Sequence, residues 1–268
     1  MSESNLLLKI AYDGSGFHGW QRQPGLRTVQ GVLEEKLETV FHVPVLLEGT
    51  SRTDTGVHAL GQCATLRGDF GIPFARIPLA ANNLLSDIRI LSAEEKPSGF
   101  HARFDAIGKT YIYRFAVSPP GEIFLRNYAY LLAKSPNIGN MSESAKYMEG
   151  TLDFASFQAA GGTERETTVR TLHSVRIKTG VGTDPSGGSY ETVDIEVTGD
   201  GFLYNMVRII AGTLLEAGFG RISPKEIKNI ITAKNRAKAG PTAPPQGLYL
   251  KEVYFGEESL SIHAKGVE

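Results

Sequence analysis

The sequence predicts an α+β fold made of two halves that repeat one order of elements: strand, helix, strand, strand, helix, strand. Three observations support this fold class. Short apolar segments with strand-like alternation occur in both halves, amphipathic helical segments separate them, and the order starts again near residue 102. The 268 residues suffice for one large domain or two modest ones, each with a real core.

The first half contains each of these elements in turn. Thr28 offers a hydroxyl N-cap to a helix that ends near Phe41 and carries an apolar stripe on one side. Pro73 fits the first turn of a second helix. Strands are expected at 6–12, 43–49, 60–67 and 88–93, and helices at 28–41 and 74–85.

The second half follows the same plan with one extra helix. Strands are expected at 109–117, 172–178, 190–197 and 248–255; residues 142–149 are expected to form the middle of one helix, and 203–217 another. The Gly-rich segment 179–189 reads as a hairpin loop, and Ser223 to Glu226 has the spacing of a capping box that opens the extra helix. We therefore expect two pseudo-symmetric ferredoxin-like halves, 1–101 and 102–268, with a central antiparallel sheet and a cleft between them.

Composition narrows the class of protein. The formal net charge of −1 argues neither for nor against a nucleic-acid partner. The single cysteine, Cys63, excludes an internal disulfide framework and a multi-thiolate zinc site. No apolar stretch approaches the roughly 20 residues that span a bilayer, and the polar start lacks the features of a signal peptide. The expected location is the cytoplasm, without membrane association.

Residues 14–19, Gly-Ser-Gly-Phe-His-Gly, match a dinucleotide-binding fingerprint letter for letter. The third glycine of that motif should open a helix, yet Trp20 to Gly25 follow and no helix can begin before about Thr28. We interpret the match as chance.

The segment from Thr50 to Ala59 gathers an arginine, an aspartate, a histidine and several hydroxyls between two strands. Asp and Gly populate turns for local reasons, which would make the segment purely structural. Alternatively, Arg52 beside Asp54 would keep a functional carboxylate ionised and oriented. On physical grounds the two readings are equally favoured.

Six ordered blocks along the chain together carry a specific resemblance. The first, Arg52-Thr53-Asp54-Thr55-Gly56-Val57-His58-Ala59, closely resembles the RTDAGVHA signature of the tRNA pseudouridine synthase A family. The others cover nearly the whole chain: Tyr12-Asp13-Gly14 with 19–23, Phe100-His101-Ala102-Arg103-Phe104, Lys109-Thr110-Tyr111-Ile112-Tyr113, Asn205-Met206-Val207-Arg208 with Gly212, and Gly247-Leu248-Tyr249-Leu250. Ser51 and Thr55 depart from the small Gly and Ala that are common beside the family's aspartate.

The resemblance implies roles for three residues. Asp54 would start the reaction, Tyr111 would stack on the uracil and take the C5 proton, and Arg208 would pair with Asp54. The implied substrate-binding residues are Arg52, Thr53, Arg22, Gln23, His58, Arg103 and Leu248. The resemblance also implies no cofactor and no metal, a tRNA substrate modified at uridines of the anticodon stem-loop, and a homodimer.

Physical reasoning supports these roles unequally. Arg208 lies at the edge of the apolar stripe of its helix, where a buried acid partner or a bound anion is favoured over a snorkelling side chain. Tyr111 shares a strand face with Tyr113, and core packing is the commoner fate of such residues. Conversion of uridine to pseudouridine needs a carboxylate, a base for the C5 proton and a flipped, stacked base. Whether Asp54 attacks the sugar, attacks the base or removes a ribose proton stays open.

Contact with RNA is a weaker inference, because scattered surface charge explains about half of such residues. The basic candidates are Arg22, Arg27, Arg52, Arg103, Lys109, Arg126, Arg165 and Arg170. One alternative function is a non-catalytic RNA-binding protein, but the sequence lacks the strand motif of RNA-recognition modules. Another is a metal-dependent hydrolase using Asp54 and His58, which lacks further acidic ligands at suitable spacing.

Overall fold

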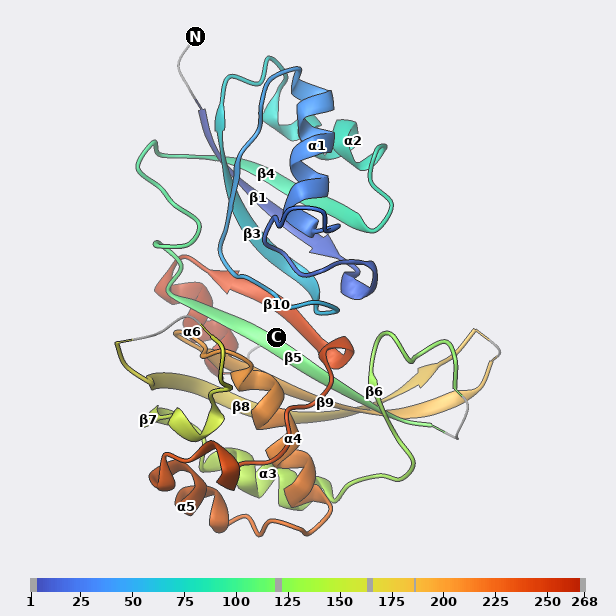
Figure 1. The fold of residues 1–268 in the computed structure, drawn as a ribbon, viewed down its shortest axis with the longest axis vertical. Helices are drawn as coiled ribbons and strands as arrows, with labels where there is room; N and C mark the ends of the chain where they lie inside the picture. Colours follow the sequence, from blue (N-terminus) through green and yellow to red (C-terminus); the bar gives the residue numbers. More distant parts are fainter. Residues whose placement is uncertain (1–3, 119–121, 163–165, 186, 266–268) are drawn as a thin grey trace. The chain divides into compact units, whose positions relative to one another are not determined.

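The computed structural model describes residues 4–118, 122–162, 166–185 and 187–265 (Figure 1). The chain forms two compact units. Unit 1 comprises Met1–Ile107 and Tyr249–Gly256, and unit 2 comprises Gly108–Leu248 and Glu257–Glu268. Compared with the division expected near residue 102, the boundary lies after Ile107, and a segment from the end of the chain groups with unit 1.

Unit 1 contains one sheet with two helices beside it (Figure 1). Its elements are β1 (Ser4–Tyr12), α1 (Val29–Phe41), β2 (Leu47–Gly49), β3 (His58–Gly68), α2 (Ile77–Asn82), β4 (Ile88–Lys96) and β10 (Leu248–Tyr254). β1 pairs antiparallel with both β3 and β4. β3 also pairs with β2, antiparallel with Leu47 opposite Leu66, and with β10, parallel with Tyr249 opposite His58.

The core of unit 1 forms where β1 meets α1. The side chains of Leu6, Leu8 and Ile10 are fully buried, as are those of Leu33 and Leu37 on the helix. Each such side chain contributes about 1.5–3 kcal/mol when removed from water. The apolar stripe expected on this helix is therefore confirmed.

The ends of α1 also agree with the sequence. The Thr28 hydroxyl accepts a hydrogen bond from the Gly31 N–H at 3.3 Å, as an N-cap should, and the helix ends where His42 adopts a left-handed conformation with φ of 59°. The first α-helix after Gly19 begins only at Val29, so the expectation that no helix opens at Gly19 is confirmed.

Two predictions in unit 1 are corrected. The expected strand 43–49 is reduced to β2, three residues long. The expected helix 74–85 is a 3-10 turn at Phe74–Arg76 followed by the six-residue α2. α2 ends at Asn82 because the Asn82 side chain pairs with the backbone of Ile90, donating to its carbonyl at 2.9 Å and accepting from its N–H at 2.8 Å.

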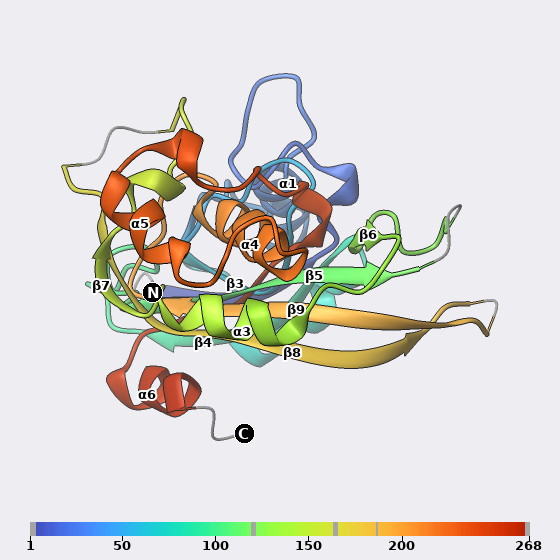
Figure 2. The ribbon, with the colours of Figure 1, turned by 90° about the horizontal axis from the view of Figure 1, so that it is seen from below.

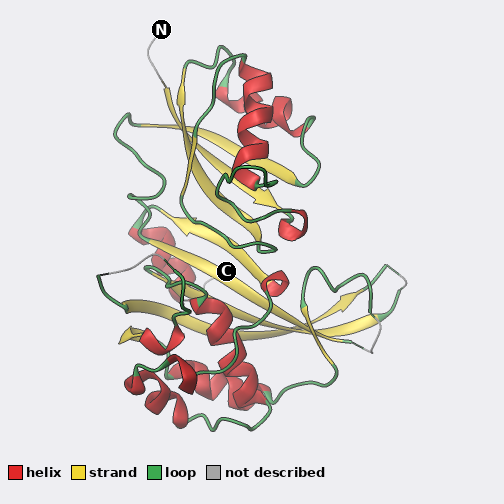
Figure 3. Ribbon diagram, viewed as in Figure 1, coloured by secondary structure: helices red, strands yellow, loops and turns green. Residues whose placement is uncertain are grey.

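In unit 2, β5, β9, β8 and β7 follow one another with antiparallel pairing. β6 pairs parallel with β5. Figure 2 shows α4 and α6 on opposite sides of these strands, and Figure 3 distinguishes helices from strands. The elements are β5 (Gly108–Val117), β6 (Tyr130–Leu132), α3 (Ile138–Lys146), β7 (Gly150–Asp153), β8 (Val169–Thr183), β9 (Ser189–Gly199), α4 (Met206–Gly218), α5 (Glu226–Ala233) and α6 (Glu257–Lys265).

The hairpin of unit 2 is longer than expected, because β8 and β9 pair as far as Thr183 opposite Ser189, through most of the predicted loop. As expected, Ser142 lies inside a helix: α3 begins at Ile138, where Asn137 caps it by accepting a hydrogen bond from the Asn140 N–H at 2.9 Å, but it ends at Lys146, before the expected Glu149. The capping-box spacing before α5 is borne out: the Glu226 carboxylate accepts a bond from the Ser223 N–H at 2.6 Å.

α4 is the central helix of unit 2. All of its residues are buried except Arg208 and Glu216. Gly212 is required there, because a Cβ at this position would lie 1.9 Å from the Pro241 carbonyl oxygen. Within the described ranges, no helix is both long and apolar enough to cross a membrane.

Candidate active site

The loop that carries Asp54 connects β2 to β3 in unit 1, and its first residues are tied to β3. The Thr50 N–H donates to the Cys63 carbonyl at 2.8 Å. The Gln62 side chain is fully buried; it accepts from the Ser51 N–H at 3.3 Å and donates to the Ser51 carbonyl at 2.7 Å. The Ser51 hydroxyl itself is buried and has no hydrogen-bond partner within the described residues.

The backbone on either side of Asp54 is also fixed. Thr53 is buried, with its hydroxyl 2.7 Å from the Tyr12 hydroxyl and its carbonyl accepting from the Trp20 N–H at 3.0 Å. The Asp54 carbonyl accepts from the Val57 N–H at 3.1 Å. The Asp54 side chain is half-buried at the turn formed by Thr55 and Gly56. These bonds fix the backbone from which the Asp54 side chain extends.

Two glycines of the apparent dinucleotide motif have a structural role here. A Cβ on Gly14 would lie 2.0 Å from the Val57 carbonyl oxygen. Gly19 has a φ of +80°, and a Cβ there would lie 2.6 Å from the Thr53 carbonyl oxygen. These glycines let the segment 14–19 pack directly on the backbone of the Asp54 loop, so their spacing reflects close packing.

His58 is almost entirely buried at the start of β3. Its Nδ1 accepts a hydrogen bond from the Gly14 N–H at 3.0 Å and also lies 3.3 Å from the Asp13 carboxylate. The contact with Asp13 is an ion pair only when the ring is protonated. The ring stacks on Tyr249 at 4.7 Å. These contacts favour a structural role for His58 over direct contact with a substrate.

The other expected binding residues of unit 1 lie on its surface. Arg22, Gln23, Arg52 and Arg103 are all exposed. The Arg103 guanidinium lies 5.5 Å from the ring of Phe104, whose side chain is itself 73% exposed. An exposed arginine over an aromatic ring is an arrangement that suits contact with an unstacked base. Arg165, another basic candidate, lies outside the described residues.

Tyr111 and Tyr113 lie on β5 in unit 2. Tyr111 is 9% exposed and meets Phe202 edge-on at 5.0 Å. Tyr113 is fully buried and donates its hydroxyl proton to the Pro244 carbonyl at 2.7 Å. Burial raises the pKa of Tyr113 far above its usual range, outweighing the opposite effect of Arg208. Tyr113 is thus a core residue, whereas Tyr111 keeps some exposed surface.

Arg208 is held in unit 2 by its own helix and a neighbouring segment. Its Nε donates to the Ala243 carbonyl and its Nη1 to the Asn205 side chain, both at 2.7 Å. The Arg208 carbonyl in turn accepts from the Ala243 N–H at 3.1 Å. Asn205 takes a left-handed conformation with φ of 58° just before α4. These bonds fix the plane of the guanidinium.

Sequence reasoning did not assign a role to Asn205, although it forms part of the Asn205–Arg208 block. The sequence does hold one signal for this contact: Asn205 lies three residues before Arg208, a spacing at which side chains on a helix can meet. Leu248, the remaining expected binding residue, is buried at the start of β10. It directly follows Gly247, where a Cβ would lie 2.8 Å from both the Arg114 carbonyl oxygen and the Tyr113 ring.

The candidate residues therefore fall into two groups. Unit 1 holds Arg22, Gln23, Arg52, Thr53, Asp54, His58 and Arg103, and unit 2 holds Tyr111, Arg208 and Leu248. Within unit 1, the Trp20 and Gly14 contacts connect the loop carrying Arg22 with Thr53, Asp54 and His58. Within unit 2, the consecutive carbonyls of Ala243 and Pro244 connect Arg208 with Tyr113 on the Tyr111 strand.

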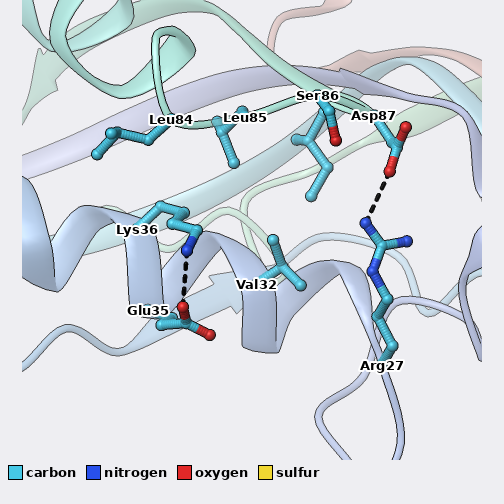
Figure 4. Close-up of a pocket in the computed structure, with 9 residues that line it drawn as sticks. Arg27, Val32, Glu35, Lys36, Leu84, Leu85, Ser86 and Asp87 are labelled. Carbon is cyan, nitrogen blue, oxygen red and sulfur yellow. Dashed lines mark hydrogen bonds and ion pairs between the residues drawn. The ribbon is translucent and has the colours of Figure 1, made fainter.

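A separate pocket of about 210 Å³ lies beside α1, away from the residues above (Figure 4). Its charged side chains are already matched: Arg27 pairs with Asp87 and Lys36 with Glu35, each at 2.7 Å. Figure 4 shows these pairs at the two ends of the pocket, with Val32 between them. We assign no catalytic chemistry to it.

Two further features bear on chemistry. In the part of the chain that the structure describes, no three His, Cys, Asp or Glu side chains are grouped as a metal site requires. Burial raises the pKa of Cys63 to about 12, so its thiol is a poor nucleophile.

Comparison with known proteins gives one consistent result. The family profile described as tRNA pseudouridine synthase matches residues 9–105 and 144–256. The tRNA pseudouridine synthase A of Bacillus subtilis is 46% identical over 252 residues, which cover 92% of this chain and 97% of the relative. The tRNA pseudouridine synthase A 2 of Clostridium tetani is 43% identical over 254 residues, covering 94% and 98%. The corresponding protein of Ruminiclostridium cellulolyticum is 44% identical over 249 residues.

Proposed function

Because the chain belongs to the tRNA pseudouridine synthase family, we propose that Asp54 starts the isomerisation of uridine. The family and its named members identify the protein as an isomerase that converts uridine in tRNA to pseudouridine. The reaction breaks the N1–C1′ bond, forms a C5–C1′ bond, releases the C5 proton and leaves N1 protonated. Atoms and electrons balance within the nucleotide and water, so the side chains need to supply only acid–base or nucleophilic chemistry.

The observation that carries the assignment is the fixed backbone around Asp54. The Trp20 N–H donates a hydrogen bond to the Thr53 carbonyl, which precedes the Asp54 nitrogen. The Val57 N–H donates one to the carbonyl of Asp54 itself. A group that must react at one atom of a flipped nucleotide gains rate from such fixed placement. The half-buried carboxylate is well suited to attack the sugar or base, or to remove a ribose proton.

Tyr111 and Arg208 complete the proposed set. Tyr111 offers a ring for stacking on the uracil and a hydroxyl that can accept the C5 proton. Arg208 offers a cation whose plane is fixed by Ala243 and Asn205, and its proposed partner is the Asp54 carboxylate.

The finer features of the substrate and fold are part of this proposal. The target uridines are those of the anticodon stem-loop, and the active enzyme is a homodimer, as the family resemblance implies. The element order of unit 1, β1-α1-β2-β3-α2-β4, supports the ferredoxin-like plan for that half. For unit 2, the order β5-α3-β8-β9-α4 matches the first five elements of the same plan with insertions, whereas the last strand of the chain, β10, groups with unit 1.

The direct test is release of tritium from tRNA labelled at uracil C5, without any added cofactor. We expect Asp54→Asn to lower kcat roughly a thousandfold or more, as expected for loss of a reacting group. Asp87→Asn removes the same charge at an exposed ion pair and should keep full activity. Activity that survives Asp54→Asn would refute the assignment of Asp54. Loss of activity on addition of EDTA would instead favour the metal-dependent alternative.

A further inference from the structure

Glu34 is a fully buried carboxylic acid on α1, in the middle of the helix face that packs against the sheet. Acidic side chains are almost never fully buried unless a partner compensates for the lost water. Its Oε1 accepts hydrogen bonds from the Gln30 side chain and from the Leu47 N–H, both at 3.0 Å. Its Oε2 has no hydrogen bond within the described residues.

The cation nearest to that second oxygen is Arg22. The Arg22 Nε lies 3.1 Å from Glu34 Oε2, although the N–H does not point at the oxygen well enough for a hydrogen bond. The contact is therefore an ion pair. It is asymmetric: the Glu34 side chain is 1% exposed, whereas that of Arg22 is 58% exposed. One end of the pair is locked in the core and the other reaches solvent.

Gln30 extends the same network to the backbone of the loop. Its Oε1 accepts from the Arg22 N–H and from the Gln21 side chain, both at 2.9 Å, while its Nε2 donates to Glu34. The first amides of α1 complete the attachment, since the Val29 and Gln30 N–H groups donate to the Gly19 and Trp20 carbonyls. These amides have no partner inside the helix, so the loop satisfies them.

The loop also contacts the neighbourhood of Asp54. Besides its bond to Thr53, the Trp20 ring occupies the space beside Gly49, where a Cβ would lie 2.4 Å from the indole nitrogen. Arg22 is thus an exposed cation on a loop that is fixed at one end to the Asp54 loop and at the other to a buried acid.

We propose that Glu34 is a positioning residue for tRNA binding, which orients the Arg22 guanidinium toward a backbone phosphate of the bound tRNA. This inference rests on the proposed function of the loop carrying Asp54 as the site of reaction. A side chain as long as arginine loses considerable freedom when it binds a phosphate, and an ion pair formed beforehand reduces that loss. Glu34 therefore acts through Arg22 and does not touch the substrate.

The test is a double-mutant cycle on the tRNA KM, with Arg22→Ala, Glu34→Gln and the double variant in the full-length enzyme. We expect each single change to raise KM by roughly threefold to tenfold. The kcat of each variant should stay within about twofold of the wild-type value. The double variant should be no worse than Arg22→Ala alone, because Glu34 has no effect once its partner is absent. Glu35→Gln, at the next position of α1 but exposed, should leave KM unchanged.

Two results would overturn the inference. KM effects that multiply in the double variant would show that Glu34 does not act through Arg22. If Glu34→Gln lowers Tm and raises the tRNA KM by the same factor with and without Arg22, the role of Glu34 is purely structural. If Glu34→Gln does not fold, Glu34→Asp keeps the charge, moves it away from Arg22 and enters the same cycle. The double-mutant cycle is measured with Asp54 intact, so its result concerns only the coupling between Glu34 and Arg22. Retained activity in Asp54→Asn, in contrast, would refute only the proposed function of Asp54.

Discussion

At the scale of single residues, the local setting of a side chain decides whether it is available for chemistry. Tyr111 and Tyr113 are two positions apart on one strand, and their sequence environments hardly differ. The structure separates them, since Tyr113 is bonded to the Pro244 carbonyl in the core and Tyr111 retains exposure beside Phe202. The strand pattern alone could not distinguish them, because the partners come from segments far along the chain; only the family resemblance singled out Tyr111.

This difference predicts opposite effects for the same substitution. Tyr111→Phe keeps the ring and removes the proposed base, so kcat should fall by about a hundredfold. Tyr113→Phe leaves the Pro244 carbonyl without its donor, so unfolding free energy should fall by about 1–3 kcal/mol with kcat unchanged. Tritium release and urea denaturation of both variants provide the measurements. Normal kcat in Tyr111→Phe would assign proton removal to another group, such as a water molecule.

Elements whose stability is local were predicted well. α1 has a hydroxyl cap and an apolar stripe, and β1 and β5 have strong alternation or strand-forming residues, so each lies close to its expected range. β6 and β7 were not predicted, because three or four residues show no periodicity and pairing with β5 and β8 creates them. α6 was also missed, since its first turn follows a strand end without a clear cap in the sequence.

One close contact gives a test of packing around α4. Gly212→Ala would place a methyl group against the Pro241 carbonyl oxygen, at a calculated 1.9 Å before any movement. Both groups are main-chain atoms or rigidly attached to them, so the helix and the 239–245 segment must separate. We expect a loss of about 3 kcal/mol in the free energy of unfolding. Gly99→Ala, with no atom within 4 Å of the added Cβ, should be nearly neutral by the same urea titration.

A second test at this scale concerns the end of α5 and β7. Lys234 lies 2.7 Å from Asp153, and this bond, followed by one from Thr168, lowers the pKa of the Asp153 carboxyl. A lowered folded-state pKa contributes stability above the unfolded value, near 3.9, and this stability is lost as the pH falls through the folded value.

Asp153→Asn should therefore lower Tm by about 2 °C at pH 7. The difference should shrink as the pH falls below the unfolded value and through the lowered pKa of the folded-state carboxyl, where the wild-type side chain becomes protonated. Calorimetry at several pH values measures both. A loss that stays equal from pH 7 down through that range would mean that the bonds to Thr168 and Ala155, rather than the charge, account for the stability.

For the molecule as a whole, six sequence blocks predict the family, and their order along the chain already assigns the Asp54 loop to the first expected half and Tyr111 and Arg208 to the second. The blocks with Arg52 to Ala59 and with Phe100 to Phe104 belong to unit 1, and those with Tyr111 and Arg208 to unit 2. The net charge of −1 shows that binding of tRNA depends on where cations lie rather than on their excess.

Salt dependence of tRNA affinity tests this distribution. Replacing a cation that contacts a phosphate should reduce the slope of log K against log salt by about 0.7 to 0.9. We expect this for Arg103→Ala, which removes an exposed guanidinium beside Phe104. Arg221→Ala, which removes an exposed cation paired with Glu216, should leave the slope unchanged. An unchanged slope for Arg103→Ala would remove Arg103 from the binding surface.

The return of the chain to β3 has a consequence for synthesis of the protein. Tyr249 and Leu250 pair with His58 and Ala59, so the sheet of unit 1 includes residues made after nearly all of unit 2. While the chain is still on the ribosome, the β3 edge at the start of that strand, directly after the Asp54 loop, lacks its permanent partner. Open strand edges attract other chains, so a nascent chain stalled before residue 249 is the form most exposed to aggregation. The start of β3, directly after the loop that carries Asp54, is thus among the last parts of unit 1 to gain its strand partner.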